Sequence, residues 1–159
     1  MTISVGDHVP STTLTKATPD GPDQVGSDDF FKGRTVAVFA VPGAFTPTCS
    51  ARHLPGFVDK EAELKARGVD EIACTAVNDP FVMAAWAKAN DAGAITMLAD
   101  GNGEFATAMG LTMDGSKFGL GQRSQRYAML VRDGVVEQLN VEEGGQFAVS
   151  SAEHLLSQI

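Results

Sequence analysis

A buried strand that leads directly into a helix start constrains this chain more than any other stretch. The apolar run Val36–Val41 is followed by Pro42-Gly43, a pattern typical of a strand that is covered on both faces and then turns. Thr46 is expected to cap a helix whose first residue is Pro47, because a proline at that position gives up no hydrogen bond. Cys49 therefore falls in the first turn of a helix.

This position favours ionisation of the Cys49 thiol. Free backbone N–H groups and the positive end of the helix dipole attract an anion, so a thiol held there should ionise more easily than a free one. A cysteine is more often a small buried hydrophobe. The capped helix start argues against that role here, as do the neighbouring hydroxyl groups of Thr46, Thr48 and Ser50. For Cys74, inside an apolar strand pattern, the core role is the better interpretation.

Composition narrows the class of protein. With 159 residues and 43% hydrophobic content, the chain can bury one core, and we expect a single domain over residues 1–159. The formal net charge of −8 comes from scattered acidic residues, with no basic stripe of the kind that binds nucleic acid. No apolar stretch would span a membrane and Met1–Pro10 does not resemble a secretion signal, so we expect a soluble, cytoplasmic protein.

Two cysteines and three histidines predict neither a disulfide scaffold nor a metal site.

Residue periodicity predicts alternating strands and helices. Strands are expected over 36–41, 71–77, 95–99, 126–132 and 135–141, and helices over 27–33, 50–67, 80–90, 104–109 and 150–159. The last two strands are joined by Asp133-Gly134, the preferred two-residue hairpin turn. Residues 4–22 are expected to form extended edge structure, and 111–124 a glycine-rich loop. This order favours a thioredoxin-like α/β fold, a mixed central sheet flanked by helices, over a doubly wound parallel sheet.

Several local details accompany these elements. Pro55 should kink or break the helix over 50–67 near Leu54. The helix over 80–90 should open at an Asp79 cap and bury Phe81, Val82 and Trp86. Ser150 and Glu153 form a capping-box pattern for the last helix.

The run Pro42-Gly-Ala-Phe-Thr-Pro-Thr-Cys49 resembles the active-site motif of peroxiredoxins. With the following His53-Leu-Pro-Gly-Phe57, it is similar to the type II, or peroxiredoxin-five, subfamily. The likeness continues through Ala76-Val-Asn-Asp-Pro-Phe-Val-Met83 and Arg126-Tyr-Ala-Met-Leu-Val-Arg-Asp-Gly134, and so covers nearly the whole chain. The resemblance implies a thioredoxin-like fold with peroxiredoxin-type insertions. It also implies a thiol peroxidase that reduces hydrogen peroxide and alkyl hydroperoxides without a metal or organic cofactor.

By motif position, the resemblance makes Cys49 the nucleophile and Thr46 the hydroxyl that orients peroxide and thiolate. Pro42 would shield the pocket, and Arg126 would be the activating cation. Residue patterns alone do not select Arg126 among the competing arginines Arg52, Arg123 and Arg132. His53 is expected to pack or to form a hydrogen bond rather than to act as a base. A Cys49 sulfur sealed in hydrocarbon, or an Arg126 side chain turned into solvent, would contradict this mechanism.

The resolving step has two candidate routes. The stretch Gly144–Ser151 lacks the C-terminal cysteine that some type II members carry, which leaves Cys74 as the internal partner for a Cys49 sulfenic acid. Cys74 is expected about four residues short of its strand end, ~13 Å away, so the turn carrying Cys49 would have to unwind. In the other route an external thiol resolves the sulfenic acid, supplied by glutathione and glutaredoxin or by thioredoxin.

Two further expectations concern partners. A different class of function is a peroxide sensor that passes oxidation to a partner protein, since that role needs the same reactive thiol. The resemblance also implies a homodimer, for which the loop residues Phe45, Phe118 and Leu120 are candidate contacts.

Overall fold

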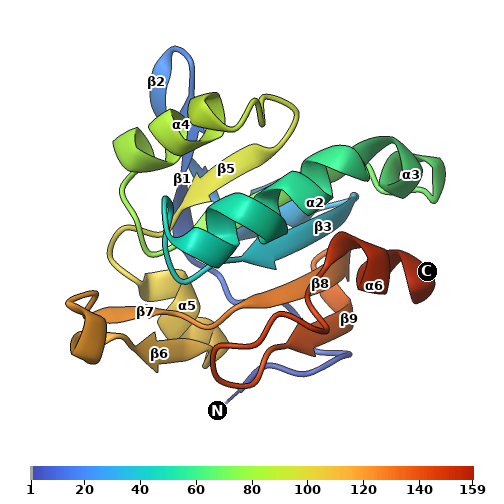
Figure 1. Cartoon of the computed structure of the whole chain (residues 1–159). Helices are drawn as coiled ribbons and strands as arrows, with labels where there is room; N and C mark the ends of the chain where they lie inside the picture. Colours follow the sequence, from blue (N-terminus) through green and yellow to red (C-terminus); the bar gives the residue numbers. More distant parts are fainter. Residues whose placement is uncertain (1) are drawn as a thin grey trace.

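A seven-stranded sheet in the order β2-β1-β5-β4-β3-β8-β9 forms the centre of the computed structural model, which describes residues 2–159 (Figure 1). Its strands are β1 (Thr13–Thr18), β2 (Gly21–Gly26), β3 (Thr35–Ala40), β4 (Glu71–Ala76), β5 (Thr96–Ala99), β8 (Tyr127–Arg132) and β9 (Val135–Val141). Strands β3, β4 and β5 run parallel, whereas β1 and β8 pair antiparallel with β5 and β3. The predicted mixed, thioredoxin-like sheet is confirmed.

Strand β3 lies between β4 and β8, and its residues from Val36 to Ala40 are fully buried. Val36, Val38 and Ala40 belong to one apolar cluster, and Ala37 and Phe39 to the other. A strand covered on both faces has no solvent face to make polar, which explains its continuous apolar run. The end of β3, from which Cys49 follows, is therefore held by neighbouring strands on both sides.

Helices cover both faces of the sheet. The cluster that contains Ala37 and Phe39 includes residues of four helices: α2 (Leu54–Asp59), α3 (Glu61–Ala66), α4 (Pro80–Ala89) and α6 (Ala152–Ser157). The opposite cluster packs against α1 (Ser27–Phe31) and α5 (Glu104–Met109). In Figure 1 the first group lies in front of the sheet, with α2 crossing over β3.

Two cap predictions have different outcomes. Asp79 caps α4 as predicted, because its carboxylate accepts a hydrogen bond from the Val82 N–H. The cap of α6 is Ser151, which accepts from the His154 N–H, so the prediction that Ser150 opens a capping box is wrong. The Ser150 hydroxyl instead donates to Glu142, a competing partner distant in sequence.

Helix α4 buries Trp86 as predicted and leaves Val82 half-buried. Phe81 was expected in the core, but it is 71% exposed. Met83 takes the buried position instead, because residues three apart share a helix face and it is Met83 that shares the inner face with Trp86.

The region after α5 is more ordered than predicted. The stretch expected to be a glycine-rich loop contains a small separate sheet of β6 (Thr112–Asp114) and β7 (Gln122–Ser124), around the 3₁₀ turn Ser116–Phe118. The hairpin after it is confirmed, with both turn residues in the left-handed region, Asp133 at φ 49° and Gly134 at φ 80°.

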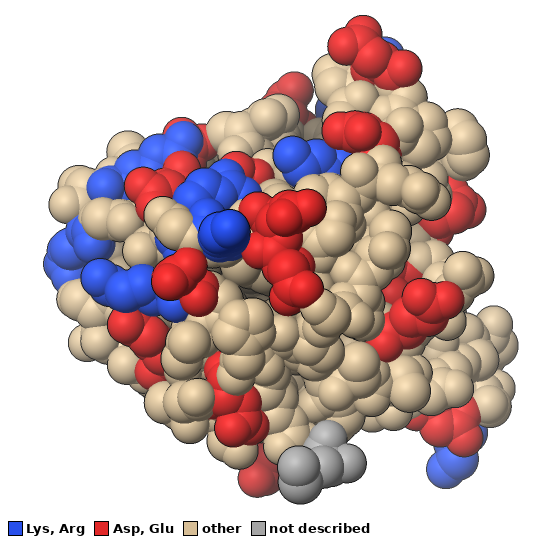
Figure 2. Space-filling view, turned by 180° about the vertical axis from the view of Figure 1, so that it is seen from behind, with Lys and Arg blue, Asp and Glu red and all other residues tan. Residues whose placement is uncertain are grey.

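Acidic side chains are scattered over the face seen in Figure 2, whereas basic ones gather toward one side, next to acidic neighbours. Among the described residues, no helix combines the length and apolar character needed to cross a membrane.

Candidate active site

The loop between β3 and the following helix places Cys49. The helical conformation begins at Pro47 as predicted, and the Thr46 carbonyl accepts the first helical hydrogen bond, from the Ser50 N–H at 3.0 Å. The Thr46 side chain does not cap the helix, contrary to the prediction. Its hydroxyl donates to the Gly43 carbonyl at 2.7 Å, which ties the turn after the strand to the helix start.

Cys49 opens the π-helical turn η1 (Cys49–His53), in which the Leu54 N–H donates to the Cys49 carbonyl five residues earlier. Pro55 follows directly, and a proline ring clashes with the carbonyl four residues before it in a regular α-helix. The wider turn makes room for that ring, and such turns are frequent at functional sites. The predicted break near Leu54 is therefore a change of helix type. A second break follows at Lys60, between α2 and α3.

Arg126 supplies the charge next to Cys49. It lies directly before β8, which pairs with β3, and its Nη2 donates to the Cys49 sulfur at 3.0 Å. Cys49 is 0% exposed and Arg126 is 9% exposed. The sulfur is hidden from solvent, but it is not sealed in hydrocarbon, because a guanidinium touches it. A hydrogen bond from a cation stabilises a thiolate more than a thiol.

His53 orients this arginine from the other side. Arg126 Nη1 contacts His53 Nδ1 at 2.9 Å, and His53 Nε2 contacts the Ser150 carbonyl at 2.8 Å. A carbonyl only accepts, so Nε2 carries the proton and Nδ1 accepts from the arginine. Burial and the Arg126 charge lower the pKa of His53 to about 3, against a smaller opposing effect of the Ser150 hydrogen bond. His53 is thus neutral and has the hydrogen-bonding role that was predicted.

Phe147 covers the outer side of this pair. Its ring centre lies 5.1 Å from that of His53 and 6.0 Å from the guanidinium carbon of Arg126. Arg52 stacks on the same ring at 4.7 Å. Cation–π contacts of this kind favour the positions of both guanidinium groups.

The other predicted arginines are occupied elsewhere. Arg123 donates to the carbonyls of Leu120 and Val77, and Arg132 pairs with Glu137. With Arg52 on Phe147, Arg126 is the arginine that the structure brings to Cys49. Pairing between distant strands makes this selection, which explains why sequence patterns could not.

Pro42 and Thr46 lie in the loop before Cys49, and both are half-buried. The neighbouring hydroxyl of Ser50 accepts a hydrogen bond from the Trp86 indole N–H at 2.9 Å. The expected collar of hydroxyl groups around the sulfur is therefore partly used for packing, because Thr46 and Ser50 bind other partners.

Cys74 lies on β4 between Phe39 of β3 and Met97 of β5, in the same apolar cluster as Cys49. Burial raises its pKa well above the usual value, the nearby Cys49 adds to this, and Arg126 opposes it. The strand ends at Ala76, two positions after Cys74, so the expectation of about four residues was too large. Both cysteines are free.

Three contributors to the site escaped the sequence analysis: Glu142, Phe147 and Ser150. Their roles depend on contacts across the fold. Ser150 acts through its backbone carbonyl, which no residue type reveals. Glu142 lies at the end of a strand among other acidic residues, and only its burial distinguishes it. The glycines at 144 and 145 show that a loop follows, but not that it folds over the arginine.

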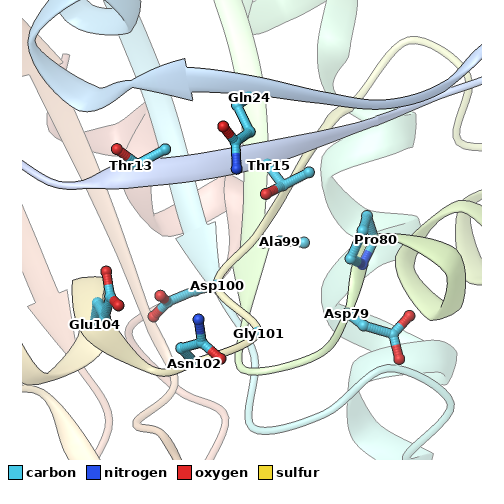
Figure 3. Close-up of a pocket in the computed structure, with 10 residues that line it drawn as sticks. All are labelled: Thr13, Thr15, Gln24, Asp79, Pro80, Ala99, Asp100, Gly101, Asn102 and Glu104. Atoms are coloured by element: carbon cyan, nitrogen blue, oxygen red, sulfur yellow. The ribbon is translucent and has the colours of Figure 1, made fainter.

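A cavity of about 440 Å³ lies elsewhere, between the β1–β2 hairpin and the starts of α4 and α5 (Figure 3). Asp100, Asn102 and Glu104 lie on one side of it, and Thr13, Thr15 and Gln24 on the other. None of the predicted site residues lines it. Within residues 2–159, no cluster of three or more histidine, cysteine or carboxylate side chains is arranged to hold a metal ion.

Comparisons with known proteins agree on one family. The Redoxin family model matches residues 4–156. The chain is 52% identical over 164 residues to the chloroplastic Peroxiredoxin-2E-2 of Oryza sativa subsp. japonica, covering 99% of this chain and 73% of that protein. It is 47% identical to Peroxiredoxin-2B of Arabidopsis thaliana, covering 99% and 98%. The crystal structure of reduced Prx3 in complex with H₂O₂ from Vibrio vulnificus has a TM-score of 0.95, with 50% identity and 98% of each chain covered.

Proposed function

We propose that Cys49 is the residue that attacks the peroxide. The chain belongs to the type II peroxiredoxins and is therefore a thiol-dependent peroxidase. The observation that carries this assignment is the 3.0 Å contact between Arg126 Nη2 and the Cys49 sulfur. The relatives are peroxiredoxins by name, which favours an enzyme over the sensor alternative.

The first step oxidises sulfur and reduces the peroxide. The Cys49 thiolate attacks one peroxide oxygen, an S–O bond forms and the O–O bond breaks. The electron pair of that bond leaves with the distal oxygen, which takes up a proton and departs as water or an alcohol. Cys49 becomes a sulfenic acid. Hydrogen peroxide and alkyl hydroperoxides are the proposed substrates.

Arg126 acts in this step beyond holding the thiolate. Full ionisation of an ordinary thiol raises its thiolate fraction at pH 7 only about 30-fold. Enzymes commonly accelerate reactions by ~10⁶-fold or more. The remainder comes from orienting the O–O bond in line with sulfur and stabilising the oxygen that gains charge. Proposed donors for that oxygen are the Arg126 guanidinium, the Thr46 hydroxyl and the Cys49 N–H. Pro42 shields the pocket.

Two thiols compete for the second step. Attack on the sulfenic acid releases water and leaves a disulfide. Cys74 is buried with a raised pKa, so it stays a protonated, weakly nucleophilic thiol while the fold is closed. Resolution by Cys74 would proceed through local unwinding of the η1 turn that carries Cys49. An external thiol, from glutathione and glutaredoxin or from thioredoxin, would need access to Cys49 alone.

We also propose that the chain forms a single domain over residues 1–159, that it assembles as a homodimer, and that it is cytoplasmic. Phe45 and Phe118 are large exposed apolar side chains, Phe118 at 80%, and Leu120 is half-buried near Phe118 in the same loop. Exposed apolar groups of this kind support an interface. Two free cysteines fit a reducing compartment.

The test is a peroxidase assay with matched reductants. Purified protein is given hydrogen peroxide or a tertiary alkyl hydroperoxide, with either thioredoxin and its reductase or glutathione and glutaredoxin. Mass mapping of the oxidised protein then locates the sulfenic acid and any disulfide. The proposal expects oxidation first at Cys49. Peroxide consumption that persists in Cys49→Ser would remove Cys49 as the nucleophile.

A further inference from the structure

Glu142 carries a buried carboxylate that does not touch the Cys49 sulfur. It directly follows β9 and is 5% exposed. Its Oε2 accepts hydrogen bonds from three successive backbone N–H groups, those of Ala148, Val149 and Ser150, at 2.8–2.9 Å. The Ser150 hydroxyl donates to the same oxygen at 2.7 Å. One side chain therefore anchors the end of the loop between β9 and α6.

The anchored loop reaches the site at two points. The Ser150 carbonyl accepts from His53 Nε2, and the Phe147 ring covers His53 and Arg126. The backbone of Glu142 also contacts the site, because its N–H donates to the Arg126 carbonyl at 2.9 Å. Glu142 thus fixes Arg126 twice: directly at the backbone, and through Ser150 and His53 at the guanidinium.

We propose that Glu142 is a positioning residue that holds the Arg126 guanidinium toward Cys49 by seating the loop whose Ser150 carbonyl fixes the tautomer of His53. This inference rests on the proposed function of Cys49 and Arg126. Glu142 touches neither sulfur nor substrate. Its effect passes along a continuous chain of hydrogen bonds, from Oε2 to Ser150, from the Ser150 carbonyl to His53, and from His53 Nδ1 to the guanidinium.

The charges around His53 give this chain a pH signature. His53 faces Arg126 and, beyond it, the Cys49 sulfur; Arg52 lies across Phe147, and Glu142 behind Ser150. Burial acts to raise the pKa of Glu142, but the hydrogen bonds from Ser150, Ala148 and Val149 outweigh it and lower the pKa. Glu142 is therefore ionised at neutral pH. If the loop is released, water reaches His53 and its pKa rises from about 3 toward the ordinary value of about 6.5, although the Arg126 charge still opposes protonation.

A protonated His53 would donate from both ring nitrogens and repel Arg126. The loss of Glu142 should therefore reduce the rate of Cys49 oxidation more at low pH than at high pH. A role in stability alone would not create that dependence.

The experiment compares Glu142→Ala with Glu143→Ala, which removes an exposed carboxylate from the adjacent position. Stopped-flow measurement gives the rate constant for oxidation of reduced protein by hydrogen peroxide between pH 5.5 and 8. We expect Glu142→Ala to be slower than the control by about 10-fold at pH 7.5. A further loss, up to ~10-fold, is expected at pH 5.5, where more of the released His53 is protonated. Glu142→Gln, which keeps an oxygen acceptor, should fall between them.

A second measurement does not depend on peroxidase activity. The ¹⁵N spectrum of the histidine rings reports which nitrogen of His53 is protonated, and His53→Gln identifies its signals. Wild type and Glu143→Ala should show the Nε2–H tautomer down to pH 4.5. Glu142→Ala should show a mixture that titrates above the wild-type pKa of about 3 and below pH 6.5.

The possible results distinguish the role of Glu142 from the proposed function of Cys49 and Arg126. Equal rates in the two alanine variants at every pH, with His53 unchanged, overturn the role of Glu142. If Glu142→Ala does not fold, Glu142→Gln takes its place, and a rate and a histidine spectrum equal to the control overturn the role in the same way. A wild type that does not react with peroxide overturns the proposed function, while the histidine spectra still test the positioning.

Discussion

Cys49 and Cys74 are equally hidden from solvent, yet their surroundings differ in one respect that governs thiol chemistry. Both are 0% exposed and belong to the same apolar cluster. Cys74 lies within a strand, and burial raises its pKa. Cys49 lies where a strand gives way to a helical turn, with a guanidinium at 3.0 Å from its sulfur. The comparison teaches that burial keeps solvent away from both thiols, whereas only Cys49 has a cation hydrogen-bonded to its sulfur.

The largest expected effect comes from removing the Cys49 sulfur. Cys49→Ser should lower peroxidase turnover by about 10⁶-fold or more, to the uncatalysed level, because a hydroxyl is not a comparable nucleophile here. Coupled consumption of peroxide with either reductant measures it. The matched variant is Cys74→Ala, which removes the other sulfur from the same cluster. If Cys49→Ser turns over peroxide as fast as Cys74→Ala, the contrast between the two thiols is wrong.

Removing the cation should make Cys49 resemble Cys74. We expect Arg126→Ala to slow oxidation of Cys49 by roughly 10²–10³-fold, the usual cost of losing one donor to a developing oxyanion. Arg126→Lys should recover only part of the rate, because an ammonium cannot reach sulfur and His53 with the same fork. Stopped-flow rates are compared with Arg132→Ala, whose arginine pairs with Glu137 at the surface. An Arg126→Ala enzyme as fast as that control would remove Arg126 from the mechanism.

The neutral state of His53 should appear in the pH dependence of stability. Its native pKa of about 3 lies below the unfolded value of 6.5, so between these values the unfolded state binds more protons. The contribution of neutral His53 to the free energy of unfolding is fully present well above pH 6.5 and decreases as the pH falls. Between pH 6.5 and pH 5 the loss should be about 1.6 kcal/mol. Urea unfolding at the two pH values measures it.

His53→Gln should lack that loss, whereas His154→Gln, which changes a half-buried histidine of α6, should retain it. Burial and the Arg126 charge keep His53 neutral, so its titration reports on the surroundings of Cys49. Identical pH slopes in the two variants would contradict the neutral assignment of His53.

The smallest effect is expected for the first chemical step in Cys74→Ala. Oxidation of Cys49 should stay within about twofold of wild type, since the lost sulfur lies on β4 and contacts no donor of the site. The small cavity left by the substitution should lower the free energy of unfolding by about 1 kcal/mol. Turnover with thioredoxin then separates the resolving routes. Unchanged turnover ends the intramolecular scheme, and accumulation of oxidised Cys49 without a disulfide supports it.

Local signals in the sequence were sufficient for most elements. The apolar run of β3, the Asp79 cap and the Asp133-Gly134 turn each specify structure through neighbouring residues, and each was confirmed. Predictions were wrong where another contact competed for the same side chain. Thr46 binds the Gly43 carbonyl, and Ser150 binds Glu142.

The residues of the site also differ in whether local sequence or distant contacts place them. Cys49 could be located from its own surroundings in the sequence, because the proline-led helix start is local. The contacts of Arg126, His53 and Glu142 depend on strand pairing and on a loop that returns from the far end of the chain. No periodicity records which of four arginines will meet one sulfur, so resemblance to a family had to supply that assignment.

The wide turn η1 makes catalysis sensitive to the length of the chain. It accommodates one residue more than an α-helical turn between Cys49 and Leu54. A deletion of Ala51 would return this turn to the ordinary four-residue hydrogen bonding and bring the Pro55 ring against the carbonyl four residues before it. The seven-stranded sheet would be untouched. Insertions and deletions in this short segment should therefore be far less tolerated than in the loop tips of the same molecule.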